Sequence, residues 1–145
     1  MNIPAADNLQ LSEEGDGIRI PLKHNLNDKG CLFAGSIYAG AILAAYREAK
    51  SRFSERGLTG ELVAKSASVN YLKSMVSDGL ASASACGEPV CKPNGNSMLT
   101  VTVSVFDEAR VCCAELLAEF VLLKERTTAG DAGRSRMCTP AEDAR

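Results

Sequence analysis

The most distinctive pattern in the chain is a run from Cys31 to Tyr46 in which no residue is charged and most are apolar or small. A helix without a polar face must be covered on every side. Alanine favours the helical conformation, and small side chains let other backbone approach closely. We therefore predict a buried central helix that becomes polar at Arg47 and ends at Gly57. The simplest cover within one domain is a sheet curled around this helix.

Five other segments have the patterns of β-strands, most of them alternating apolar and polar residues. They are Asp16–Leu22, Leu62–Leu72, Leu80–Cys86, Ser97–Phe106 and Val111–Lys124. Within the second segment the apolar side chains face one way, and the polar row of Ser66, Ser68 and Asn70 faces the other. The polar row is therefore a candidate lining for a site.

The order of elements is one strand, the long helix, and then four strands joined by short turns. Such a run of strands predicts an α+β fold, in which an antiparallel sheet packs one face against the helix. One helix leaves a sheet face and the strand edges uncovered, so we expect a symmetric dimer. We expect this domain to span residues 16–125, between an N-terminal arm (residues 1–15), loose or with a short helix, and a disordered tail (residues 126–145).

Composition narrows the classes of function. A chain of 145 residues suits one domain, and its net charge of −2 gives no global basic surface for nucleic acid. Six cysteines at spacings that fit no metal site, without a signal peptide, predict reduced and mostly buried thiols in a cytoplasmic protein. The apolar run is too short for a membrane span, which needs about 20 apolar residues. Neither nucleic acid nor a membrane is an expected partner.

The residues around the helix start resemble a known family. The stretch PLKHNLNDKGCLFAGSIYAGAILAAY is similar to the active-site segment of hot-dog acyl-thioesterases. It is most similar to the putative thioesterase family first noted as the C-terminal half of a bacterial acetyltransferase-like protein. The resemblance covers roughly residues 16–124 and is specific around Asn27, Gly30, Gly35 and the strand end Asn70–Lys73. It implies the hot-dog fold, a long central helix wrapped by a curved antiparallel sheet.

The resemblance also implies a site at the helix N-terminus. Thioester hydrolysis develops an oxyanion at the acyl carbonyl, which free amides at a helix start can stabilise. Catalytic roles would fall to Asn27, which orients substrate or water, to Gly35, and to Ser36 as a helix cap that hydrogen-bonds the acyl group. The residues expected to bind substrate are Phe33, Ala34, Tyr38, Ser66, Ser68, Asn70 and Lys73.

Each of these assignments has a structural alternative. Asn27 could simply form the turn before the helix, and the polar row could be ordinary solvated strand residues. Ser36 is not expected to act as a nucleophile, because the only histidine of the chain is His24 and no triad is evident. The GxxxxG spacing from Gly30 to Gly35 lacks the lysine of a phosphate-binding loop, which excludes a nucleotide site of that kind.

The chain departs from the family at the positions that supply a base. Many relatives have a histidine where this chain has Phe33 and an acid where it has Ile42, and Glu48 lies too far along the helix to replace them. A base would then come from elsewhere, including across a dimer interface. The same departure disfavours a dehydratase of this fold.

Two hypotheses remain. The first is an acyl-thioester hydrolase acting on acyl-CoA or an acyl carrier protein, with the acyl chain in a tunnel at a dimer interface. The second is a non-catalytic module that binds acyl-CoA or a fatty-acyl group. In both, coenzyme A or phosphopantetheine enters as part of the substrate, without a separate cofactor or metal. We expect a homodimer or a dimer of dimers, in which Lys65, Lys73 and Lys92 could meet phosphate groups.

Overall fold

The computed structural model describes residues 2–125 of the chain. Its elements in chain order are α1 (Pro4–Asn8), β1 (Ser12–Glu14), β2 (Gly17–Ile20), the 3₁₀ helix η1 (Leu22–His24), α2 (Ala34–Glu55), β3 (Glu61–Tyr71), β4 (Gly79–Ala85), β5 (Val90–Cys91), β6 (Ser97–Phe106) and β7 (Cys112–Leu123). The long helix and all five expected strands are present, with boundaries close to those predicted from the sequence.

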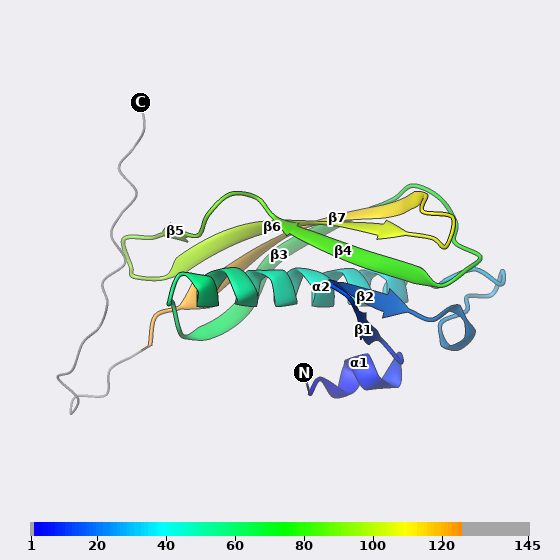
Figure 1. Ribbon diagram of the computed structural model, residues 1–145, viewed down its shortest axis with the longest axis horizontal. Helices are drawn as coiled ribbons and strands as arrows, with labels where there is room; N and C mark the ends of the chain where they lie inside the picture. The colour runs from blue at the N-terminus through cyan, green and yellow to red at the C-terminus, as the bar shows by residue number, and fades with distance from the viewer. Residues whose placement is uncertain (1, 126–145) are drawn as a thin grey trace.

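One antiparallel sheet forms the body of the molecule, in the order β1-β2-β4-β6-β7-β3, with β5 paired to the start of β6. Figure 1 shows α2 lying along one face of this sheet, which curves but does not close around the helix. The predicted α+β architecture is confirmed. Strand β3 lies at an end of the sheet and pairs only with β7 in the described chain, so its other edge is open.

The core lies between α2 and the sheet. Strand β6 has the clearest alternation: Val101 and Val105 are fully buried, whereas Thr102 between them is exposed on the other face. On the helix, Ala41 and Ala45 are fully buried. Because these helical side chains are methyl groups, the α2 backbone can lie close to the branched side chains of the sheet.

The sheet covers α2 on one side only, which differs from the expectation that the helix is covered on every side. The buried residues of α2 are Ser36, Ile37, Gly40, Ala41, Ala44, Ala45, Ala49 and Phe53. Tyr38, Ile42 and Tyr46, at intervals of four residues, form an apolar strip that is only half-buried. The Tyr46 ring lies 6.2 Å from that of Phe120 on β7, so the strip follows the β7 and β3 side of the sheet. An open sheet on one face cannot surround a helix.

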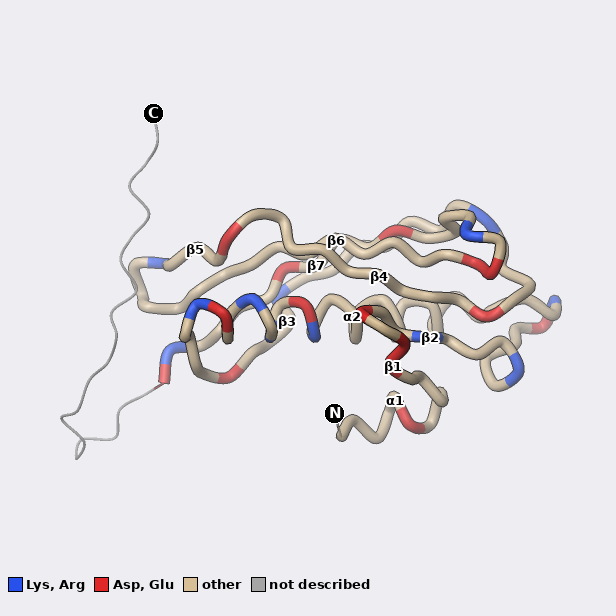
Figure 2. Tube along the Cα trace, viewed as in Figure 1, with Lys and Arg blue, Asp and Glu red and all other residues tan. Residues whose placement is uncertain are grey.

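The far end of α2 is polar, as expected. Figure 2 shows charged residues gathered at its C-terminal end, where Glu48 accepts a 2.9 Å hydrogen bond from Arg52. The Glu48 carboxylate also accepts a bond from the Ala85 backbone N–H. Glu48 is therefore held near the end of β4, several helical turns along α2 from the first residues of that helix.

Residues 2–15 are more ordered than a loose arm. They contain the short helix α1 and the strand β1, which pairs with β2 from Ser12 to Glu14. The Asn25 side chain donates to the Leu9 carbonyl, which ties this segment to the loop before α2. A strand of three exposed residues has no apolar pattern by which the sequence could indicate it. The predicted disordered tail, residues 126–145, lies outside the described residues.

Two expectations about environment can be compared with the structure. Cys31, Cys86, Cys112 and Cys113 are free thiols, but only Cys113 is buried, so the expectation of mostly buried cysteines is wrong. Cys91 is disulfide-bonded, which also differs from the expectation of reduced cysteines. Within residues 2–125, no helix is both long enough and apolar enough to span a membrane.

Candidate functional site

The first turn of α2 presents two free backbone donors. Phe33 is the N-cap residue and has an extended backbone, with φ −65° and ψ 133°. Its carbonyl accepts the N–H groups of both Ser36 and Ile37 at 3.0 Å. The N–H groups of Ala34 and Gly35 have no acceptor among residues 2–125, and both residues are exposed. Two amides, those of Ala34 and Gly35 but not that of Ser36, can therefore bind an anionic oxygen at the positive end of the helix dipole.

Ser36 is not the cap that the sequence suggested. It lies in the first turn of α2, is 3% exposed, and no side chain caps the helix. Its side chain is buried on the sheet side of the helix together with Ile37. Ser36 therefore lies beside the two free donors but does not cap the turn that carries them.

The ring of Phe33 lies over Gly35. A Cβ atom built on Gly35 would stand 2.6 Å from Cε1 of this ring, too close for any other residue unless the ring moved. Phe33 is 53% exposed, so solvent surrounds the rest of the ring. Glycine at position 35 therefore makes room for the Phe33 ring beside the free Gly35 amide.

Tyr71, at the end of β3, holds this first turn from outside the helix. Its hydroxyl donates a 2.9 Å hydrogen bond to the Ala34 carbonyl. That carbonyl and the Gly35 N–H belong to one peptide group, so the bond fixes the direction of the Gly35 donor and polarises it. Burial, with a smaller contribution from Tyr38, raises the pKa of Tyr71, so its hydroxyl keeps its proton at neutral pH.

Tyr71 was not among the site residues expected from the sequence. The signal was available, because alternation in β3 places Tyr71 on the same face as Ala67 and Val69, the face that α2 covers. What the sequence could not supply was the distance along that face. Only the packed structure shows that β3 ends beside the first residues of α2.

Asn27 closes the loop that leads into α2. Its side-chain oxygen accepts the N–H groups of Lys29 and Cys31 at 2.8 and 2.9 Å, and its own N–H donates to the Cys31 carbonyl. Gly30 in this loop has a φ of +75°, which glycine adopts without strain. The side-chain NH₂ of Asn27 has no acceptor within the described chain, so it is the part of Asn27 that could reach a ligand.

Asn25 also fixes this loop, although it was not expected from the sequence to be a site residue. It is 4% exposed, and its NH₂ group donates to the carbonyls of Leu9 and Pro21. Its backbone carbonyl accepts the Phe33 N–H at 2.7 Å, which positions the N-cap residue. Its side-chain oxygen is buried without a partner among the described atoms. Its neighbours His24 and Leu26 are exposed on either side of it, so no alternating or helical pattern indicates its burial.

Asp78 supports the loop from the start of β4. Its carboxylate accepts the Leu22 N–H at 2.8 Å and two bonds from the Arg19 guanidinium at 3.0 and 2.6 Å. The hydrogen bond from the Leu22 N–H is the main cause that lowers the pKa of Asp78, and the hydrogen bond from Arg19 is the second. A carboxyl whose pKa is lowered on folding stabilises the protein above its unfolded pKa, and this contribution disappears as the pH falls through the folded pKa.

We expect Asp78→Asn to lower the free energy of unfolding at pH 7 but to matter progressively less below about pH 4, the ordinary pKa of an unfolded aspartate, as the pH falls towards the lowered pKa of the folded carboxyl. Urea unfolding of both proteins from pH 7 downward would measure this difference. Asp16→Asn is the matched control, because Asp16 is exposed and forms no ion pair in residues 2–125. A difference that stayed constant across this pH range would contradict the role of the charge.

The polar row is not brought to the first turn of α2 within one chain. Ser66, Ser68 and Asn70 lie on the sheet face away from α2, where the Ser66 hydroxyl donates to Glu119 of β7 at 3.0 Å. Lys73 is exposed just past β3, and its backbone N–H donates to the Cys113 carbonyl. Tyr38 lies on the half-buried strip of α2, near Tyr71.

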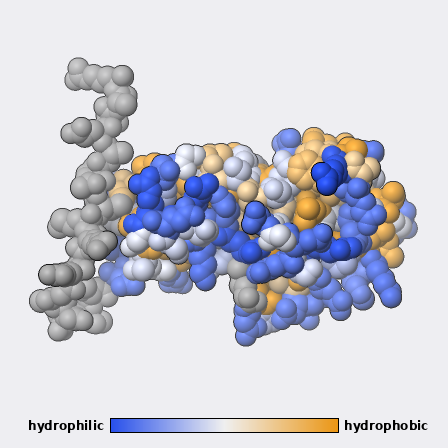
Figure 3. Space-filling model, in the orientation of Figure 1, coloured by the Kyte–Doolittle hydropathy of each residue, from blue (hydrophilic) through white to orange (hydrophobic). Residues whose placement is uncertain are grey.

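Exposed apolar side chains gather around the candidate site. They are Leu26, Phe33, Tyr71, Leu72 and Val76, each at least 48% exposed. Figure 3 shows hydrophobic surface at this end of the molecule, where Figure 1 places the start of α2. Within residues 2–125, no group of His, Cys, Asp or Glu is arranged to hold a metal ion. The site thus consists of two amides and one positioned hydroxyl, bordered by apolar surface.

Comparisons with known proteins address the fold and the family. Residues 2–124 match the family model described as "Putative thioesterase (yiiD_Cterm)". A structure of a putative thioesterase from Shewanella oneidensis has a TM-score of 0.74 and 20% identity, and the match covers 85% of this chain and 90% of that one. A thioesterase from Haemophilus influenzae has a TM-score of 0.65 and 16% identity, and covers 82% of each chain.

A third similar structure is a Bacillus halodurans protein solved with CoA, with a TM-score of 0.67 and 16% identity over 85% of this chain and 78% of that one. No curated protein matches the chain. At these identities the structures establish the fold alone, which is the hot-dog fold expected from the sequence.

Proposed function

Since this chain belongs to the putative thioesterase family whose model covers residues 2–124, we propose that it is an acyl-thioester hydrolase acting in the cytoplasm on acyl-CoA or an acyl carrier protein. In this reaction a water oxygen bonds to the acyl carbon, the carbon–sulfur bond breaks, and the thiol leaves with a proton. Negative charge develops on the acyl oxygen before the thiol leaves. The main requirement is therefore a pair of preorganised donors facing that oxygen.

The observation that carries this proposal is the pair of free N–H groups at Ala34 and Gly35, with Tyr71 bound to the carbonyl between them. The acyl oxygen would accept both N–H groups. Donors fixed in position before the reaction stabilise charge without the cost of reorganisation. Tyr71 would act as a positioning residue through the Ala34–Gly35 peptide, and Phe33 would turn aside to admit the thioester.

The acyl chain would lie along the half-buried strip of Tyr38, Ile42 and Tyr46. This strip starts one turn after the two donors and follows the open side of the sheet. A second copy of the chain, paired through the free edge of β3, would cover the strip and form the rest of a tunnel. The base that activates water would then come from the second copy, because Ile42 occupies the position of the usual acid.

The CoA-bound structure from Bacillus halodurans supports a CoA thioester as the substrate, by likeness of fold. The second candidate function is a non-catalytic module that binds acyl-CoA or a fatty-acyl group. It is favoured by Phe33 and Ile42, which replace the histidine and acid that relatives carry. Both candidates use the same two amides, so only turnover separates them.

We expect purified protein to release free thiol from at least one member of a series of acyl-CoA and acyl carrier protein thioesters, as measured with a thiol reagent. Asn27→Asp keeps the oxygen that accepts the Lys29 and Cys31 N–H groups but removes the NH₂ group. We expect it to lower kcat about tenfold, the value of roughly one hydrogen bond, with little change in thermal unfolding.

Asn27→Ala removes both the oxygen and the NH₂ group and should lower stability as well as turnover. Full activity of Asn27→Asp would mean that Asn27 only forms the loop. The proposal that the protein is a hydrolase would not be affected by that result. Saturable binding of acyl-CoA without release of thiol, for every substrate in the series, would instead establish the binding module.

A further inference from the structure

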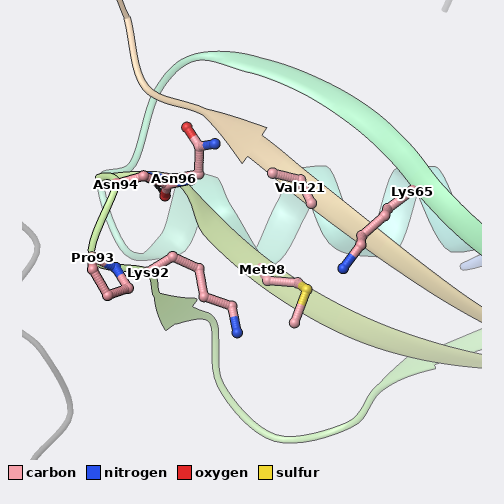
Figure 4. A pocket seen from close by; sticks show the side chains of 7 residues that line it. All are labelled: Lys65, Lys92, Pro93, Asn94, Asn96, Met98 and Val121. Atoms are coloured by element: carbon pink, nitrogen blue, oxygen red, sulfur yellow. Dashed lines mark hydrogen bonds between the residues drawn. The ribbon is translucent and has the colours of Figure 1, made fainter.

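A hollow of about 500 Å³ lies on the sheet face away from α2, far from the candidate site. The β5–β6 loop, the start of β6, the end of β7 and a bulge in β3 border it, and it is open to solvent. Figure 4 shows its lining side chains in front of the sheet and α2 behind it. Its volume is within the range of about 300–1,000 Å³ typical of small-molecule sites.

The floor of this hollow is apolar. Met98 of β6 and Val121 of β7 are paired directly across the two strands, and both are half-buried on this face. Each lies between residues whose side chains enter the core on the other face, such as Leu99 and Phe120. Two apolar side chains turned away from the core, in a hollow, offer a surface for the apolar part of a ligand.

The rim carries hydrogen-bond donors. The Asn94 side-chain oxygen accepts the Asn96 N–H at 3.0 Å, and the Asn96 side-chain oxygen accepts the Lys124 N–H at 2.9 Å. Both amide oxygens are therefore engaged, and these bonds fix which atom of each amide is oxygen. The two NH₂ groups, which have no acceptor in the described chain, are left as donors.

Two ammonium groups complete the rim. Lys65 is the extra residue at the β3 bulge between Ala64 and Ser66, and such a bulge redirects a side chain. Lys92 begins a tight loop closed by its N–H bond to the Asn96 carbonyl at 2.7 Å. In residues 2–125 neither lysine forms an ion pair, and Figure 4 shows both side chains extending over the hollow.

We propose that this hollow binds an amphipathic organic anion, whose carboxylate or phosphate lies between Lys65 and Lys92 and whose apolar part covers Met98 and Val121. A rim of four donor groups with both amide oxygens engaged selects a ligand that is rich in acceptors. The apolar floor selects against a small inorganic anion. This site does not depend on the hydrolase, because it shares no residue with the first turn of α2.

The test uses the full chain with its methionine methyl groups labelled for NMR. The probes are decanoate (carboxylate with an apolar chain), CoA (phosphates), decanol (no charge) and inorganic phosphate (no apolar part). We expect decanoate, CoA or both to shift the Met98 methyl signal saturably, and decanol and phosphate not to. A response to decanoate alone identifies a carboxylate ligand, and a response to CoA alone identifies a phosphate ligand.

Lys65→Gln and Lys92→Gln should each weaken the binding seen at Met98 about tenfold, whereas Lys50→Gln, on the exposed end of α2, should not. Because the Met98 signal reports this hollow, binding of the same probes at the α2 site does not confuse the result. The proposal is overturned if no probe shifts Met98 at millimolar concentration. It is equally overturned if decanol binds as well as decanoate, or if the lysine variants bind unchanged.

Discussion

Replacing Ala34 by proline should lower kcat for thioester hydrolysis about 10²–10³-fold, the usual cost of one donor to an oxyanion. The substitution removes the Ala34 N–H, which has no acceptor in the described structure. The fold should tolerate it, because Ala34 is the first residue of α2, where proline is favoured. Phe33 before it already has the extended backbone, with ψ of 133°, that a residue preceding proline requires.

The control for this experiment is the stability of the same variant. Thermal unfolding of Ala34→Pro should match that of the wild type, and KM should change much less than kcat, since the donor acts mainly in the transition state. An unchanged kcat in a stable variant would show that the Ala34 N–H does not meet the acyl oxygen.

Tyr71→Phe tests the hydroxyl that positions the second donor, the Gly35 N–H. It removes the hydroxyl that binds the Ala34 carbonyl but leaves the aromatic ring. We expect kcat to fall about tenfold, the effect of one lost hydrogen bond. A stable ketone analogue that imitates the oxyanion should bind more weakly to this variant, whereas a thioether analogue of the substrate should bind equally well. Equal loss for both analogues would indicate a general disturbance of the fold and not a positioned donor.

Gly40→Val should lower the free energy of unfolding by about 1–3 kcal/mol, the cost of overfilling a packed core. A Cβ atom on Gly40 would collide with Cδ1 and Cγ1 of Ile20, which is fully buried on β2. The glycine therefore lets α2 and β2 come into contact. Helix propensity works the other way, since glycine is a poorer helix former than valine, so the expected loss comes from the collision.

Two companion variants isolate that collision. Ala39→Val lies next to Gly40 on α2 at a half-buried position and should cost only the helical penalty of a β-branched residue, up to about 0.7 kcal/mol. In urea unfolding, Ile20→Ala combined with Gly40→Val should lose less stability than the sum of the two single changes. Strict additivity would show that the two residues do not compete for the same space.

The sequence also located the start of the candidate site, for a local reason. Turn residues at Asn27 and Gly30, followed by an uncharged helical run, determine where the helix starts, and a helix start always leaves free N–H groups. How many remain free at Ala34, Gly35 and Ser36 depends on where the Phe33 carbonyl points. That is a detail of the N-cap geometry, which no residue pattern specifies.

The chain's own pattern determined the long helix and the five main strands. Each strand at the centre of the sheet needs a regular alternation to bury one face, and the long helix needs an uncharged run to lie against the sheet. Both patterns involve residues close together in the sequence, so both elements can be predicted from it. Tertiary structure alone decided which residues from distant segments meet. The Tyr71 hydroxyl reaches the Ala34 carbonyl, and Lys65 and Lys92 border the same hollow. Such meetings depend on strand register and on the curvature of the sheet, which arise from packing across the whole domain and leave no periodic trace in the sequence.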